Sequence, residues 1–345
     1  MAILTFKPKQ VTKRLVGVLP ERAYDVLSSR FGLEDSTDRQ TLESIGKKYG
    51  ITRERVRQIE NFALQSIKKS DTFKKEQVSF DELHSVVDSL GAVLPEDELL
   101  SSLSPDESTR NHLYLFLVLG DPFVREKEDE HFKHRWSIDK SLSSNVYDAL
   151  RRVYENLKDD ELVPESEIIA NFLSDLKNVS EKYKNEEIAR RWLALSKRIG
   201  RNQFGDWGRA SSSNIRTRGM RDYAYLVIRR HGNPMHFREV AEAITDAFNK
   251  KAHVATTHNE LIRDPRFVLV GRGLYALNEW GYTKGVVRDV IREVLKKEGP
   301  MTREQIAEKV LKERYVKENT IAVNLQNGKY FKKTCEHDDE PKNAH

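Results

Sequence analysis

The sequence predicts a mainly α-helical protein with small β wings, in which an N-terminal helix-turn-helix domain precedes a series of winged-helix-like units. Three observations predict this fold class. Residues 41–69 form two helix patterns separated by a glycine turn. Phrases that begin at Pro234-Met235 and Pro300-Met301 repeat each other with an offset of 66 residues. The apolar alternation around Gly271-Arg272-Gly273 is typical of a β-hairpin.

Length and composition limit the class of protein. A chain of 345 residues is long enough for two or more domains with separate cores. Its single cysteine, Cys335, excludes an internal disulfide and favours the reducing cytoplasm. The longest apolar run, Leu113 to Leu119, is far shorter than the roughly 18 residues of a membrane span, and no secretory leader precedes it. We therefore expect a cytoplasmic protein with no membrane partner.

Charge is segregated along the chain. Residues 1–70 hold 14 Lys/Arg and 8 Asp/Glu, whereas residues 71–130 hold 5 and 15, and residues 131–345 hold 40 and 31. The chain is thus basic, then acidic, then basic. This pattern favours an anionic partner for the basic parts.

The first 70 residues predict three helices. One begins at Pro20, with Ala23, Val26 and Leu27 on one face. A short second helix runs from about Leu42 to Tyr49, and its Gly46 leaves room for another helix to cross closely. Gly50 supplies a turn, and Thr52 is a good N-cap for the third helix.

The third helix, residues 53–67, is amphipathic at about 100° per residue. Its apolar arc holds Val56, Ile59, Ala63 and Ile67, and its polar arc holds Arg53, Glu54, Arg57, Gln58 and Asn61. Arg pairs with guanine, Gln and Asn with adenine, and Glu with cytosine in the major groove. A helix-turn-helix that places this second helix in the groove explains the residue mixture better than a solvated helix does.

Two phrases in this region, "LPERAYDVLSSRFGL" (19–33) and "TLESIGKKYGITRERVRQIENFAL" (41–64), resemble region 4 of sigma-70 family sigma factors. In that family the domain reads the −35 promoter element and contacts the flap of the RNA polymerase β subunit. The resemblance implies that Arg53, Glu54, Arg57 and Gln58 read bases. It implies phosphate contacts for Arg55, Lys47, Lys48 and Thr52. Promoter DNA and the polymerase core are the partners it implies, with a nucleoid-associated location.

The sequence also departs from a full sigma factor. Such a factor has an aromatic-rich region upstream of region 4 that melts the −10 element, and the similarity here begins near Met1. We expect that this chain does not open promoters alone, and that its region-4 fold is used as a DNA-binding or polymerase-binding adaptor.

Repeated units follow. The two Pro-Met phrases each come after a helix pattern and precede a strand-like phrase, in the order helix, strand, helix, helix, hairpin. Fainter copies begin near Val78 and Leu162. The expected domains are residues 1–72 (helix-turn-helix), 73–140 (acidic unit), 141–215 (basic unit), 216–283, and 284–345 with an irregular polar tail.

The third repeat, with "HFREVAEAI" and "DPRFVLVGRGLYALNEWG", resembles the HARE-type helix-turn-helix domain. That domain occurs in the delta subunit of bacterial RNA polymerase and in chromatin and restriction proteins. The resemblance implies a nucleic-acid-associated role, either through DNA contact or as a packing unit between partners.

Several other segments carry more than one interpretation. The basic unit offers Arg190, Arg191, Lys197 and Arg198 either as phosphate contacts or as a solvated face. We expect Trp192, Trp207 and the apolar run at 113–119 to lie in cores, and the carboxylates at 126–130 to form a solvated loop. The tail residues Cys335, His337 and His345 lack the paired spacing of a zinc site, so we expect no metal and no cofactor.

Three functions compete. The favoured one is a transcription regulator acting at promoters with RNA polymerase. The alternative is an accessory, delta-like polymerase subunit acting mainly through protein contacts, with residues 71–130 as a nucleic-acid mimic. A nuclease is the third, but the sequence has no phosphate loop, catalytic triad or carboxylate-lysine cluster, so we expect no enzymatic activity.

Overall fold

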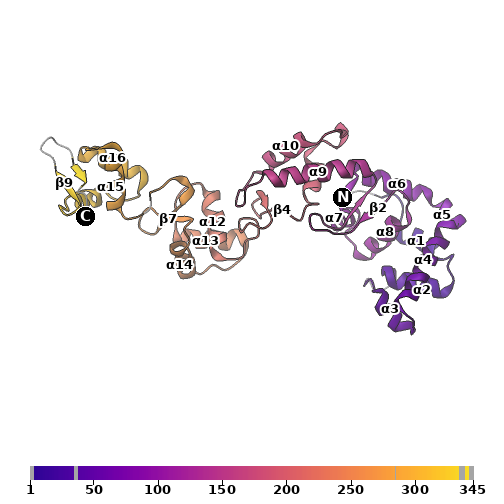
Figure 1. Ribbon diagram of the computed structural model, residues 1–345. Coiled ribbons are helices and arrows are strands. Elements are labelled where there is room, and N and C mark those ends of the chain that lie inside the picture. Colours follow the sequence, from indigo (N-terminus) through magenta and orange to yellow (C-terminus); the bar gives the residue numbers. More distant parts are fainter. Residues whose placement is uncertain (1–3, 35–37, 284, 334–338, 342–345) are drawn as a thin grey trace. The chain divides into compact units, whose positions relative to one another are not determined.

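The helices of the N-terminal domain form where the sequence supplies caps and apolar faces. The computed structural model describes residues 4–34, 38–283, 285–333 and 339–341 (Figure 1). The first helices are α1 (Pro8–Val16), α2 (Glu21–Phe31), α3 (Leu42–Tyr49) and α4 (Arg53–Lys69). Helix α1 is an addition to the three expected helices; it has Pro8 in its first turn, where no amide donor is needed, and buries Val11 and Leu15.

The acidic segment folds as the order of its sequence signals predicts. Its elements are α5 (Asp71–Lys75), α6 (Gln77–Ser89), β1 (Val93–Pro95), α7 (Glu96–Leu103), α8 (Glu107–Leu119), β2 (Val124–Glu126) and β3 (Arg135–Ser137). The antiparallel sheet has the order β1-β3-β2, and Trp136 faces Leu94 on one side and Arg125 on the other. The apolar run at 113–119 lies in α8, and Leu113, Leu115, Phe116, Leu117 and Leu119 are fully buried, which confirms the core prediction.

The basic segment repeats the order with a reduced sheet. Its elements are α9 (Lys140–Asn156), α10 (Glu165–Asp175), η1 (Glu181–Tyr183), α11 (Glu186–Leu193), β4 (Ile199–Arg201) and β5 (Trp207–Arg209). Strands β4 and β5 form an antiparallel hairpin, and Val163 makes an isolated bridge to Trp207 where the first strand would lie. Trp192 and Trp207 are buried as predicted.

The third repeat is the most regular. It contains α12 (Met220–His231), β6 (Met235–His236), α13 (Phe237–Phe248), α14 (Val254–Arg263), β7 (Phe267–Leu269), β8 (Leu274–Leu277) and η2 (Asn278–Trp280). The sheet has the antiparallel order β6-β8-β7, with Gly273 at a φ of 73° in the turn of the hairpin. The hairpin predicted around Gly271-Arg272-Gly273 is therefore confirmed.

The fourth repeat comprises α15 (Val287–Glu298), α16 (Arg303–Glu313), α17 (Glu318–Leu325), β9 (Phe331–Lys333) and β10 (Asp339–Pro341). The expectation of an irregular tail is wrong for residues 339–341, because they pair antiparallel with residues 331–333 as a second wing strand. The remaining expected tail residues, 334–338 and 342–345, include Cys335, His337 and His345 and lie outside the described residues.

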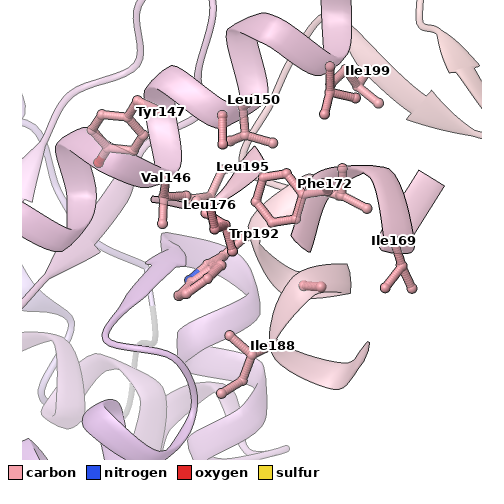
Figure 2. Close-up of a cluster of buried hydrophobic side chains, with 14 of the residues drawn as sticks. Val146, Tyr147, Leu150, Ile169, Phe172, Leu176, Ile188, Trp192, Leu195 and Ile199 are labelled. Carbon is pink, nitrogen blue, oxygen red and sulfur yellow. The ribbon is translucent and has the colours of Figure 1, made fainter. Parts of the chain in front are cut away.

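The chain divides into two compact units, Met1–Ser211 and Ser212–His345. Within the first unit, one core joins Leu15, Leu27 and Ile67 to Phe80 and Phe116, so hydrophobic packing is continuous across the expected boundary at residue 72. A second core in this unit collects the basic segment. Figure 2 shows Trp192, Phe172 and Leu150 among its side chains. The finer five-part division stays a prediction.

The close approach of α11 to the turn after α6 depends on one glycine. Gly91 has a φ of 117°, in the left-handed region that favours glycine. The Trp192 indole donates a 3.0 Å hydrogen bond to the Gly91 carbonyl. A Cβ at position 91 would lie 2.9 Å from Cγ2 of Ile188, so only glycine admits this contact.

The mainly helical fold with small antiparallel sheets is the class that the sequence predicts. In the part of the chain that the structure describes, every helix is too short or too polar to cross a bilayer.

Candidate nucleic-acid interface

Local hydrogen bonds fix the two helices that the sequence predicts as a helix-turn-helix. The hydroxyl of Thr41 accepts from the Ser44 amide at 3.1 Å and caps α3. Gly50 ends α3 at a φ of 62°, and the Ile51 amide donates to the Gly46 carbonyl at 2.9 Å. The hydroxyl of Thr52 then accepts from the Arg55 amide at 3.2 Å and begins α4. The turn is therefore specified by residues within it.

A small core holds α3 against α2 and α4. Val26, Ile45 and Val56 are fully buried against one another, with Ile51 and Ile59 packed at their edge. Gly46 lies where a Cβ would come 2.7 Å from the Ile51 carbonyl oxygen. The absence of a side chain at Gly46 thus leaves room for the backbone of the turn. The sequence had suggested that it leaves room for another helix to cross.

The predicted base-reading residues all lie on the exposed face of α4. Arg53, Glu54, Arg57 and Gln58 are exposed, whereas Val56, Ala63 and Ile67 are buried. The Arg57 guanidinium donates two hydrogen bonds to the Glu54 carboxylate, at 2.6 and 2.9 Å. This pairing lowers the pKa of Glu54 and raises the pKa of Arg57.

A second pair on the same face joins Arg55 to Gln58. The Arg55 guanidinium donates to the side-chain oxygen of Gln58 at 3.0 Å. The face therefore presents two i,i+3 pairs, Glu54 with Arg57 and Arg55 with Gln58. To contact a base, a side chain of either pair would have to break its hydrogen bond within the protein and form one with the base. Side chains that are already paired lose less conformational entropy in this exchange than four unpaired side chains would.

The other predicted phosphate contacts of this domain lie beside the turn. Lys47 is exposed and pairs with Glu43 at 3.0 Å, one helical turn earlier. The Lys48 ammonium lies 5.2 Å from the centre of the Tyr49 ring. The Thr52 oxygen is occupied as the N-cap acceptor, while its hydroxyl proton remains available to donate. The structure thus brings Lys47, Lys48 and Thr52 to the entrance of α4.

The predicted phosphate contacts of the basic segment have partners within the protein. Arg190 pairs with Glu165 at 2.7 Å, and Lys197 pairs with Glu128 at 2.7 Å. Arg191 is largely buried beside Glu98 and Glu187. The Arg198 guanidinium lies 3.7 Å from the Tyr154 ring centre. Arg191 and Lys197 thus contact the acidic segment, whereas Arg190 and Arg198 contact groups of the basic segment itself. Contact of these cations with phosphate stays a prediction.

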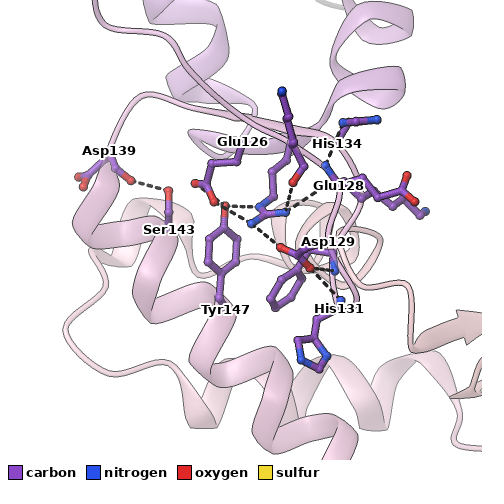
Figure 3. Close-up of polar contacts among 12 residues, drawn as sticks. Glu126, Glu128, Asp129, His131, His134, Asp139, Ser143 and Tyr147 are labelled. Atoms are coloured by element: carbon purple, nitrogen blue, oxygen red, sulfur yellow. Dashed lines mark hydrogen bonds and ion pairs between the residues drawn. The ribbon is translucent and has the colours of Figure 1, made fainter.

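The carboxylates at 126–130 match the predicted solvated loop in part: Glu128, Asp129 and Glu130 are exposed, whereas Glu126 is half-buried. Glu126 and Asp129 also bind a buried arginine, which the sequence did not suggest. Arg135 is buried and donates to Glu126 at 2.7 Å, to Asp129 at 3.0 Å and to the Tyr147 hydroxyl at 2.8 Å (Figure 3). Burial raises the pKa of Tyr147 to about 12. A guanidinium removed from water needs several acceptors, and these side chains supply them.

Sequence reasoning missed the polar contacts between the helix-turn-helix region and the acidic segment. Arg14 donates to Glu76 at 2.6 Å, Lys68 pairs with Asp121 at 2.7 Å, and Arg39 donates to Asn111 at 2.7 Å. The partners are separated by 53 to 72 residues, and no local signal connects them. It also left out Phe62, whose side chain is 56% exposed on α4 beside the polar arc.

We looked for a metal-binding cluster among the described residues. Their His, Cys, Asp and Glu side chains form no group of three or more that could hold a metal ion. The α3–turn–α4 region presents an exposed helix face rich in hydrogen-bond donors, with Lys47 and Lys48 beside it.

Comparisons with known proteins match the same region. Residues 15–69 match the family model described as sigma-70, region 4. A stretch of 68 residues is 40% identical to the RNA polymerase principal sigma factor HrdD of Streptomyces griseus and covers 20% of each chain. A stretch of 67 residues is 43% identical to the RNA polymerase sigma factor SigA of Bacillus sp and covers 19% of this chain and 18% of the relative. The chain spans about a fifth of the length of the curated relatives it matches.

Proposed function

We propose that this protein is a DNA-binding transcription factor whose α4 enters the major groove of promoter DNA at a −35-type element. Arg53, Glu54, Arg57 and Gln58 are the proposed base-reading residues, and Lys47, Lys48, Thr52 and Arg55 the proposed phosphate contacts. The same domain is proposed to contact the RNA polymerase core. The function is one of recognition, without catalysis.

The exposed polar face of α4 is the observation that carries this proposal. A capped helix follows a glycine turn, and its first two turns present Arg, Glu and Gln to solvent while its apolar face is buried. That combination is what a recognition helix needs, because base edges are read by side chains near the helix N-terminus. The match of residues 15–69 to sigma-70 region 4 supports the −35 element and the polymerase as targets.

One observation favours the accessory-subunit alternative. The acidic segment, with 15 Asp/Glu and 5 Lys/Arg at residues 71–130, shares a hydrophobic core with α1, α2 and α4. Its negative charge therefore stays close to the helix-turn-helix, where it opposes the approach of DNA phosphates. In a delta-like subunit the polymerase contact would dominate and α4 would contribute little.

Binding to short duplexes tests the proposal. We expect the full chain to bind a fluorescent −35-type duplex more tightly than a scrambled duplex, in a fluorescence anisotropy titration. The double variant Arg57→Ala/Gln58→Ala is expected to lose this preference, by about tenfold or more for each base contact removed. Lys75→Ala, an exposed charge change outside the helix-turn-helix, is the matched control and should keep the preference. Equal affinity of the wild type for both duplexes would refute sequence reading by α4.

Purification of tagged protein after nuclease treatment separates the two candidates. Polymerase subunits that accompany both the wild type and the Arg57→Ala/Gln58→Ala variant, with no duplex preference in either, would support the accessory role. Duplex preference together with co-purified polymerase would support the sigma-like role.

A further inference from the structure

A cleft lies between the β7–β8 hairpin of the third repeat and the segment that joins α16 to α17 in the fourth. Its walls include residues 269–274 of the hairpin, residues 285–287 at the start of α15, and residues 314–317. All of them belong to the second compact unit. The cleft has a volume of about 820 Å³. Sites for small molecules typically have roughly 300–1,000 Å³, so the cleft is large enough for one.

Backbone contacts fix the two walls of the cleft against each other. The Tyr315 amide donates to the Val270 carbonyl at 2.8 Å, and Gly271 forms an isolated parallel bridge with Tyr315. A Cβ at position 271 would lie 2.9 Å from the Tyr315 carbonyl oxygen. The glycine that the sequence marks as part of a hairpin therefore also lets the segment after α16 approach the end of β7. The cleft is thus formed by the packing of the two repeats.

Apolar side chains line this cleft without being covered by the protein. Leu269, Val286 and Tyr315 are 49%, 60% and 53% exposed, and Leu311 is 37% exposed. The described part of the chain has eleven exposed large apolar side chains, and these four share one cleft. Single exposed apolar residues are ordinary, whereas several gathered in a concave surface are typical of a binding site.

The charged side chains described in the walls of the cleft are all cations, namely Arg272, Arg314 and Lys317. Arg272 and Lys317 are exposed, whereas Arg314 is 2% exposed. Within the described residues, none of the three has a carboxylate within ion-pair distance. The cleft therefore combines an apolar surface with unpaired positive charge.

Arg314 is the cation whose hydrogen bonds are incomplete. Its guanidinium donates to the backbone carbonyls of Leu269, Thr283 and Gly285. These bonds use three of its five N–H groups. The Nε–H and one Nη1–H have no acceptor in the part of the chain that the structure describes. A guanidinium removed from water needs further acceptors, and an anion in the cleft can supply them.

Two carboxylates lie near Arg314 without lining the cleft. Burial lowers the pKa of Arg314, and attraction to Glu313 and Asp289 only partly opposes this effect. Glu313 accepts from the Thr283 hydroxyl at 2.6 Å, and Asp289 accepts from the Val286 amide at 3.0 Å. Both are thus engaged elsewhere. The planar guanidinium matches a carboxylate better than it matches separate carbonyls, which favours a ligand carboxylate as the missing partner.

A neighbouring groove between α16 and α17 has the opposite electrostatic character. Its charged lining consists of one cation and three carboxylates, namely Arg303, Glu304, Glu308 and Glu318. A polyanion spread across both grooves would meet these carboxylates, whereas a single carboxylate seated beside Arg314 would not. The charges therefore favour a small anion over a nucleic acid as the occupant of the cleft.

We propose that this cleft binds a small organic acid with an apolar body, of the size of a medium-chain fatty acid. The carboxylate of the ligand pairs with Arg314, and its apolar body covers Leu269, Val286 and Tyr315. Arg272 and Lys317 attract the anion to the cleft. The site is independent of base reading by α4.

Isothermal titration calorimetry of the full chain with octanoate tests the proposal. We expect one octanoate per chain and an affinity about tenfold or more above that for octanol, because hydrogen bonds to a charged group are stronger than neutral ones. Acetate, which lacks the apolar body, should not bind measurably. Arg57→Ala/Gln58→Ala should bind octanoate as the wild type does, so failure of this site is distinguishable from failure of α4.

Two exposed valines of the fourth repeat localise the binding. Val286 lines the cleft at 60% exposure, whereas Val323 on α17 is 59% exposed and lies outside the lining. Val286→Glu places a second carboxylate beside the ligand and should weaken octanoate binding about tenfold or more. Val323→Glu is the matched control and should leave the affinity unchanged. Arg314→Met should lower the affinity for octanoate to that for octanol, with amide exchange of α15 and α16 as the check on folding.

Three outcomes would overturn the proposal. The first is equal affinity of the wild type for octanoate and octanol, which would show that the charge is not recognised. The second is equal octanoate affinity in Val286→Glu and Val323→Glu, which would place the ligand elsewhere. The third is self-association of the chain that Val286→Glu abolishes, without octanoate binding, which would assign the cleft to a second copy of the protein.

Discussion

Replacement of Gly46 by alanine tests whether helix propensity or tertiary packing controls the stability of α3, because the two effects have opposite signs at this position. On propensity alone, alanine inside α3 should stabilise the helix by about 1 kcal/mol relative to glycine. In the structure, the added Cβ would lie 2.7 Å from the Ile51 carbonyl oxygen, well inside ordinary contact. The obstacle is backbone, and it is held on both sides by the Ile51-to-Gly46 hydrogen bond and the Thr52 cap.

The expected net effect of Gly46→Ala is a loss of stability of about 1–2 kcal/mol in this region, because overpacking costs roughly 1–3 kcal/mol. The displaced segment leads directly into α4, so duplex binding should weaken as well. Gly50→Ala is the matched control. Gly50 has a φ of 62° with open space around it, so alanine there meets only the left-handed backbone cost of about 1–2 kcal/mol.

Hydrogen exchange is the suitable assay, because a chain with two compact units need not unfold in one step. Amides of α3 and the first turn of α4 should exchange faster in Gly46→Ala, while those of α9 keep their rates. Slower exchange in α3 than in the wild type would show that the turn moves aside at little cost. The argument from close packing would then be wrong.

The remaining predictions concern a cap, a buried cation and a buried histidine. Thr52→Ala should cost about 1 kcal/mol by removing the acceptor of the Arg55 amide; exchange of the first turn of α4 reports it, and Thr52→Ser should restore protection. Arg135→Ala should lower the free energy of unfolding of the first unit by about 3–5 kcal/mol in urea, whereas exposed Arg151→Ala should change it by less than about 0.5 kcal/mol. Burial lowers the pKa of His112 to about 4, so the unfolded chain takes up a proton first as the pH falls. Stability should therefore decline between about pH 6.5 and pH 4, and His112→Gln should flatten that part of a pH titration of stability.

Each of the three has an outcome that contradicts it. Unchanged exchange in Thr52→Ala would mean that water replaces the cap without cost. If Arg135→Ala lowered the free energy of unfolding no more than Arg151→Ala does, the hydrogen bonds of the buried Arg135 guanidinium would contribute little to stability. An identical pH profile with and without His112 would assign the acid sensitivity to the carboxylates.

The sequence by itself determined the parts of the fold that depend on neighbouring residues. Thr52, Gly50 and the spacing of Val56, Ala63 and Ile67 define α4 and its exposed face, because caps, turns and helix periodicity act over one or two turns. The order of helices, strands and hairpins in the repeats is specified in the same way. The base-reading prediction could be made for this reason: all its residues lie on one helix.

Only the tertiary structure decided which distant groups meet. Phe80 joins Ile67 in one core although a domain boundary was expected between them, and Lys197 pairs with Glu128 across 69 residues. Such contacts follow from how whole elements pack, and many pairings of similar apolar and charged residues are compatible with one sequence pattern. The basic residues of the second repeat could therefore be recognised from the sequence, but their protein partners could not. Packing also buried most of α8, whereas α14 and α17, which follow in the later repeats, each bury two residues.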